Sequence, residues 1–161
     1  MEKTWQESVA AVWAEAESIP EAEVVLRIDA LVSEADDADP DALFESASAR
    51  DFAGREADAI GLYQSALDRG LAEPQRSRAV IQLASSMRNV GRPQDAIDVL
   101  QGGFADDPDH PLADAARAFL SLCLLDTGDA RAATAVALDA QAAHLPQYSR
   151  SVRAYAAELT R

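Results

Sequence analysis

The sequence predicts an all-α protein, an αα-superhelix made of a right-handed stack of about three helix pairs. Three observations support this fold class. The 161 residues are 48% hydrophobic and include only seven Gly and seven Pro, a composition that favours helices. No stretch alternates apolar and polar residues as a strand does. A glycine motif recurs every 37 residues, and a fixed period of this size indicates a repeat architecture. We therefore expect residues 1–161 to form a single helical domain.

The repeated motif is Gly-Arg-x-x-Asp-Ala-Ile, which begins at Gly54 and again at Gly91, with a weaker copy at Gly128. Each glycine separates two helical stretches and can take the left-handed conformation that often ends a helix. Pro93 and Asp129 follow two of the glycines and suit the start of the next helix. Residues 40–147 are thus expected to form three antiparallel helix pairs.

Small residues stand at three equivalent positions of each copy, where the two helices of a pair would cross. They are Ala47, Ala59 and Ala66; Ala84, Ala96 and Gly103; and Ser121, Ala133 and Ala140. This spacing resembles the tetratricopeptide repeat (TPR). Three positions for larger residues depart from the pattern, because they hold Ser46, Arg50 and Ala137.

Residues 43–159 resemble a small stand-alone bacterial TPR family of unassigned function. The resemblance is carried by the segments 54–60, 63–71, 81–91 and 145–151. It implies a TPR-like stack and a binding role, and it supplies no catalytic residue.

Residues 1–38 precede the repeats as a predicted helix pair broken at Pro20, and residues 148–161 follow them as a predicted capping helix. Open ends of a repeat stack need a cover. The face that carries Trp5 and Trp13 is therefore interpreted as a cap or as a self-association surface that would give a homodimer. A platform for ligand stacking is the alternative.

The formal net charge is −14, and the first 58 residues hold sixteen acids against four basic residues. This balance argues against a nucleic-acid or anionic-membrane partner. The acidic region is either a solvated face or a docking surface for a basic partner. The first residues do not resemble a signal peptide, and no apolar run reaches the roughly 20 residues of a membrane span. We expect a cytoplasmic protein.

Candidate chemistry in the sequence is weak. Asp37-x-Asp39-x-Asp41 resembles the start of a calcium loop but lacks the required Gly and Glu, and residues 106–110 read as a turn. The single Cys123 lies in an apolar run and is interpreted as an inert core thiol. We expect no catalytic residue, no metal ligand and no cofactor, and therefore a protein that is not an enzyme.

Binding is the remaining function, and one polar stripe is its candidate site. On the helix expected over residues 77–90, the residues Arg78, Gln82, Ser85 and Asn89 share one face, opposite an apolar face that includes Val90. In a TPR-like stack this face lines the concave groove, to which Phe44 and Ser48 would add from the first repeat. We predict that the groove binds a protein or peptide. The alternatives are a solvated stripe, or pairing of Arg78 with Asp41 or Glu45.

Overall fold

The computed structural model describes residues 3–36 and 38–161. These residues form helices, and no strand occurs among them. The chain divides into two compact units, Met1–Ser86 and Met87–Arg161, and each is described by itself below. Helix α5 (Gln75–Asn89) begins in the first unit and ends in the second. The all-α prediction is confirmed, and the single domain stays a prediction.

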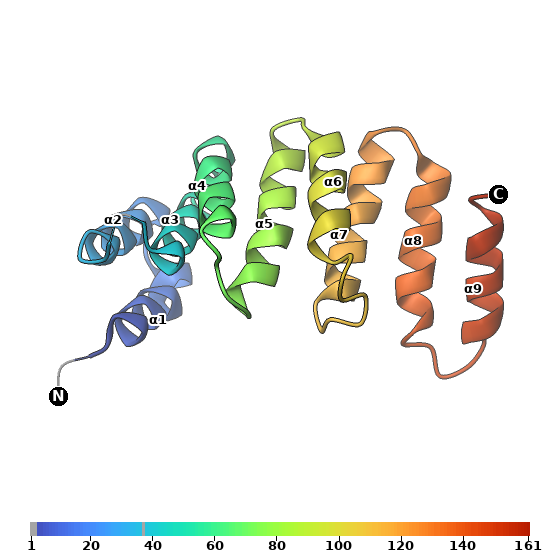
Figure 1. Ribbon diagram of the computed structural model, residues 1–161, viewed down its shortest axis with the longest axis horizontal. Coiled ribbons are helices and arrows are strands. Elements are labelled where there is room, and N and C mark those ends of the chain that lie inside the picture. Colours follow the sequence, from blue (N-terminus) through green and yellow to red (C-terminus); the bar gives the residue numbers. More distant parts are fainter. Residues whose placement is uncertain (1–2, 37) are drawn as a thin grey trace. The chain divides into compact units, whose positions relative to one another are not determined.

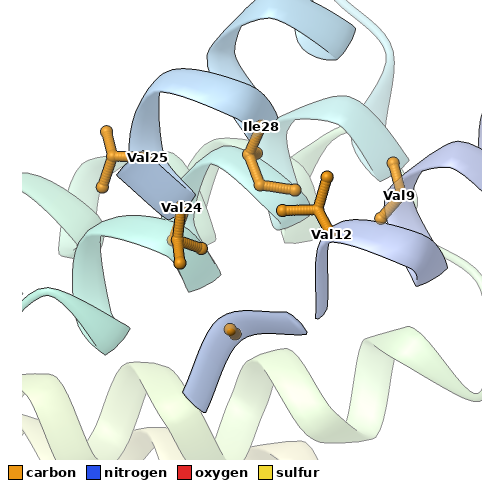
Figure 2. Close-up of a cluster of buried hydrophobic side chains, with 7 residues drawn as sticks. Val9, Val12, Val24, Val25 and Ile28 are labelled. Atoms are coloured by element: carbon orange, nitrogen blue, oxygen red, sulfur yellow. The ribbon is translucent and has the colours of Figure 1, made fainter. Parts of the chain in front are cut away.

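The first unit opens with the expected helix pair, α1 (Trp5–Glu15) and α2 (Glu21–Val32), joined through a 3₁₀ turn (Ala16–Ser18). Thr4 and Glu7 form a capping box that satisfies free N–H groups at the start of α1. The apolar sides of the two helices meet in a buried cluster (Figure 2). The cluster comprises Val9, Val12, Ala16, Val24, Val25, Ile28 and Ala49. Because Ala49 belongs to the repeats, this core joins the N-terminal pair to them.

The first repeat follows as α3 (Pro40–Phe52) and α4 (Glu56–Asp68), which pack against each other. Pro40 occupies the first turn of α3, and the Asp39 carboxylate accepts hydrogen bonds from the Asp41 and Ala42 N–H groups. The three small residues predicted at the crossing of this pair, Ala47, Ala59 and Ala66, are fully buried. Small side chains here let the two helix backbones approach closely.

The periodic glycines end their helices as predicted. Gly54, Gly91 and Gly128 have φ angles of 67°, 80° and 91°, in the left-handed region. In each case the N–H of the next residue bonds back to a carbonyl five residues earlier, which is the Schellman arrangement. These bonds run from Arg55 to Arg50, from Arg92 to Met87 and from Asp129 to Leu124, at 2.8, 2.8 and 2.9 Å. Gly70 ends α4 in the same way with a φ of 83°, although it lies outside the 37-residue period.

The Arg-x-x-Asp part of the motif forms an ion pair at the start of the second helix of two repeats. The Nε of Arg55 lies 2.9 Å from Asp58 Oδ2, and the Nε of Arg92 lies 2.6 Å from Asp95 Oδ2. The third copy begins with Asp129, whose carboxylate instead caps the helix through the Ala132 N–H at 2.9 Å. In all three repeats the motif therefore supplies a side-chain interaction at the start of the second helix, an ion pair in two and a cap in the third.

Two departures from the repeat pattern form one polar link between α2 and α3. The Nη1 of Arg50 donates to Asp29 Oδ1 (2.9 Å) and to Ser46 Oγ (2.7 Å), and its Nη2 donates to Asp29 Oδ2 (3.2 Å). Arg50 thus replaces an apolar contact with a two-pronged bond to the N-terminal pair.

The second unit contains α6 (Pro93–Gly103), α7 (Ala113–Asp126), α8 (Ala130–Ala142) and α9 (Ser149–Glu158). Successive helices of this set pack against one another, and α9 lies along α8 (Figure 1). The side chain of Cys123 is buried on α7, as expected of a core thiol.

Candidate protein-binding surface

The predicted stripe lies on α5, opposite a well-buried side. Val80, Leu83, Ala84 and Met87 are at most 3% exposed. On the other side Arg78 is exposed, whereas Gln82 and Ser85 are half-buried. These three residues belong to the first unit, and Asn89 lies on the same helix within the second. Val90, which we expected on the buried side, follows the end of α5 and is 40% exposed, so that assignment was wrong.

Gln82 is the least satisfied polar residue of the stripe. Its Oε1 is buried and accepts no hydrogen bond from any described residue. A buried acceptor without a donor costs about 1–3 kcal/mol. The Arg78 guanidinium, one turn earlier, has no ion-pair partner among the described residues, although its charge acts on Glu45. Among the described residues, the Gln82 side-chain oxygen thus lacks a hydrogen-bond donor, and the Arg78 guanidinium lacks an anionic partner.

Phe44 and Ser48 are buried between α3 and α4, with exposures of 5% and 8%. The Phe44 ring lies 6.1 Å from the Tyr63 ring. The Tyr63 hydroxyl donates to Ser48 Oγ at 3.4 Å. The structure therefore places these two residues in the packing of the first repeat and does not bring them together with Arg78 on an open surface.

Trp13 covers part of the α3 face that we expected to line a groove. Its Nε1–H donates to Glu45 Oε2 at 2.6 Å, and its ring meets Phe52 edge-on at 5.9 Å. Burial raises the pKa of Glu45, and the Trp13 hydrogen bond and the charge of Arg78 oppose that rise. Sequence reasoning missed this contact, because the two residues are 32 positions apart.

Trp5 makes a second indole contact within the first unit, where its Nε1–H donates to the Leu31 carbonyl at 3.0 Å. Both indole N–H groups are therefore bonded inside the unit, and both rings are half-buried. This arrangement fits the capping interpretation of the Trp5 and Trp13 face.

A polar network links α3, α4 and α5 beneath the stripe. Ser86 is fully buried and donates to Asp51 Oδ1 at 2.9 Å, and the Tyr63 hydroxyl lies 3.5 Å from Asp51 Oδ2. Burial raises the pKa of Asp51, and the Ser86 hydrogen bond partly offsets this rise. The same burial raises the pKa of Tyr63 above its ordinary range. The network helps to fix the position of α5 on the first repeat.

The residues singled out for candidate chemistry in the sequence lie as follows. Asp39 caps α3, and Asp37 lies outside the described residues. The Nδ1 of His110 accepts the Leu112 N–H at 3.1 Å, and burial raises the pKa of the Cys123 thiol. Within 3–36 and 38–161 no group of three or more His, Cys, Asp or Glu could hold a metal ion. No helix in these ranges is long and apolar enough to cross a membrane.

Comparison with known proteins agrees with this architecture. The sequence profile of the tetratrico peptide repeat matches residues 40–159. The structure is similar to the crystal structure of nearly identical TPR-like repeats from a Podosopora anserina protein described as a kinesin light chain. That match has a TM-score of 0.75 and 18% identity, and it covers 99% of this chain and 89% of the other.

A single-substitution variant of the same protein matches with a TM-score of 0.74 and 16% identity, over 96% of this chain and 85% of the other. No curated protein matches the chain significantly. TPR folds generally mediate protein–protein interactions, and their members are typically scaffolds without catalytic activity. Since the profile spans all three predicted repeats, the chain belongs to the tetratricopeptide repeat family.

Proposed function

We propose that this chain is a non-enzymatic interaction module that binds a peptide or protein segment along α5, through Arg78, Gln82 and Ser85. The observation that carries the proposal is the exposed guanidinium of Arg78, which has no ion-pair partner among the described residues and lies one turn from the half-buried amide of Gln82. A ligand carboxylate can pair with Arg78 in a two-pronged bond, and the Gln82 amide can meet a ligand N–H if its side chain turns toward the surface.

An extended peptide offers both groups. Its main chain presents N–H donors at regular intervals, and an acidic side chain or the terminal carboxylate supplies the negative charge. Ser85, half-buried one turn beyond Gln82, adds a hydroxyl that can donate or accept. Asn89 continues the stripe on the same helix. Phe44 and Ser48 are buried in the packing of the first repeat and are not part of the proposed surface.

Selection from a random peptide library, followed by fluorescence anisotropy on the selected peptides, tests the proposal. We expect Arg78→Ala and Gln82→Ala each to weaken binding about tenfold or more, a loss of about 1.4 kcal/mol or more. The affinity of Asn89→Ala for the same peptides tests separately whether binding extends along the helix.

Arg69→Ala is the matched control, because Arg69 is an exposed arginine of the same unit that lies at the end of α4. It removes the same charge and is expected to leave affinity unchanged. Equal affinities of wild type, Arg78→Ala and Gln82→Ala would place the binding surface elsewhere. Circular dichroism of each variant verifies that the helices are intact.

A further inference from the structure

The last helix of the second unit has one side packed and one side open. The packed side of α9 lies on α8 and includes Ala156, which is 3% exposed. No element of the second unit lies on the opposite side of α9 (Figure 1). Tyr148 and Tyr155, at 77% and 66%, are the most exposed large hydrophobic residues in the described part of the chain.

The open side of α9 also carries a symmetric pair of charges. Arg150 lies four residues before Ala154, and Glu158 lies four residues after it, so each is about 6 Å along the helix from the alanine. Both side chains are exposed, and neither has an ion-pair partner among the described residues. Arg153 differs, because it turns toward Asp139 of α8 at 3.8 Å.

We propose that α9 is a self-association surface that takes a second copy of this chain. Two α9 helices pair antiparallel about a two-fold axis beside Ala154. Arg150 then meets Glu158 of the partner subunit, and the symmetry repeats the contact, so one interface contains two ion pairs. The small side chain of Ala154 lets the helix axes approach to about 8–10 Å. The Tyr155 ring lies at the edge of this contact and contributes apolar area.

Charge selects both the partner and its orientation. A parallel pair would set arginine against arginine and glutamate against glutamate, whereas the antiparallel pair sets opposite charges together. The net charge of −14 opposes association of two copies in general, but residues 148–161 hold three arginines and one glutamate. The acids that make up the net charge therefore lie almost entirely outside this segment.

The size of the contact sets its strength. Two ten-residue helices bury less than the roughly 1,200–2,000 Å² of a stable protein interface, so the dimer is weak and forms as concentration rises. Sedimentation equilibrium over about a hundredfold range of concentration measures it. We expect wild type to shift from monomer to dimer across that range.

Charge reversal tests the geometry. Arg150→Glu and Glu158→Arg each place like charges at both contacts, and each is expected to weaken the dimer about tenfold or more. An equimolar mixture of the two variants restores opposite charges at both contacts and is expected to dimerise as well as wild type. The Arg150→Glu/Glu158→Arg double variant restores them within one chain.

Arg69→Glu is the matched control, because it makes the same charge change on an exposed arginine in the other unit. It is expected to leave dimerisation unchanged. A wild-type chain that stays monomeric at the highest concentration overturns the proposal. The proposal is also overturned if Arg150→Glu and Glu158→Arg each dimerise as well as wild type. It is likewise overturned if an equimolar mixture of these two variants does not dimerise.

Discussion

The Nε1–H of Trp13 donates a 2.6 Å hydrogen bond to a carboxylate oxygen of Glu45. The bond joins α1 to α3, the first helix of the repeats. Together with the edge-on contact between Trp13 and Phe52, it makes α1 a fixed cover over one face of α3. Arg78, at the start of the α5 stripe, acts electrostatically on the same carboxylate. The stripe therefore begins beside a surface that α1 already covers.

Trp13→Phe tests the contribution of this hydrogen bond, because it keeps an aromatic ring against Phe52 and removes the donor. The half-buried Glu45 carboxylate then lacks its partner, and we expect a loss of about 1–2 kcal/mol in unfolding free energy. Urea unfolding followed by the fluorescence of Trp5 measures the stability of the first unit.

Glu45→Met supplies the second arm of a double-mutant cycle for the same bond, because methionine fills similar space and has no oxygen to accept the Trp13 N–H. If the bond stabilises the unit, the loss of unfolding free energy caused by Trp13→Phe is smaller in the Glu45→Met background. An identical cost in both backgrounds would show that the Trp13 effect comes from ring packing alone.

Arg50→Met tests the polar link between α2 and α3. Methionine fills similar space but leaves Asp29 and Ser46 without their donor, and we expect a loss of about 1–3 kcal/mol in unfolding free energy. Asp29→Asn is the companion variant. Equal stability of Arg50→Met and wild type would mean that an apolar residue serves this repeat position as well as arginine does.

The sequence was sufficient to predict features that depend on local chemistry. The glycine turns were predictable because glycine takes the left-handed conformation at a helix end without the steric cost that a Cβ brings. The buried alanines were predictable from the spacing of helix crossings. The contact of Trp13 with Glu45 was not, because it depends on how α1 docks on α3. Phe44 was placed in a groove by its repeat position, whereas the Tyr63 ring holds it in the core.

Gly54→Ala should destabilise the first unit, because alanine must adopt a φ of 67° at the end of α3. The expected loss is about 1–2 kcal/mol. Gly61→Ala should instead raise the unfolding free energy of the same unit, since Gly61 lies inside α4 and a Cβ there meets nothing within 4 Å. The expected increase in unfolding free energy is about 0.5–1 kcal/mol. Urea unfolding followed by tryptophan fluorescence measures both, and effects of the same sign would contradict the assigned backbone roles.

Cys123 should react slowly with a thiol reagent in the folded protein and quickly in denaturant. Its side chain is 1% exposed, and burial raises its pKa, so little thiolate is present at neutral pH. The rate of labelling by a chromogenic disulfide measures this protection. Rapid labelling of folded protein would show that the second unit opens readily around α7.

Asp51 should make the stability of the first unit fall as pH rises. Burial raises its folded-state pKa above that of the unfolded chain, which is about 3.9. The folded state therefore holds the proton to higher pH than the unfolded state, and its stability declines as pH rises from the lower pKa to the higher. Asp51→Asn removes the ionisable group but keeps an oxygen that can accept the Ser86 hydrogen bond.

The unfolding free energy of Asp51→Asn relative to wild type should therefore grow in the variant's favour above about pH 4 and level off once Asp51 is ionised in the folded state. Urea unfolding at a series of pH values, followed by tryptophan fluorescence, measures the difference. Asp68→Asn, at an exposed position of the same unit, is the control and should keep the wild-type profile. A difference that instead moves in favour of wild type as pH rises would mean that the ionised carboxylate stabilises the network through Ser86 and Tyr63.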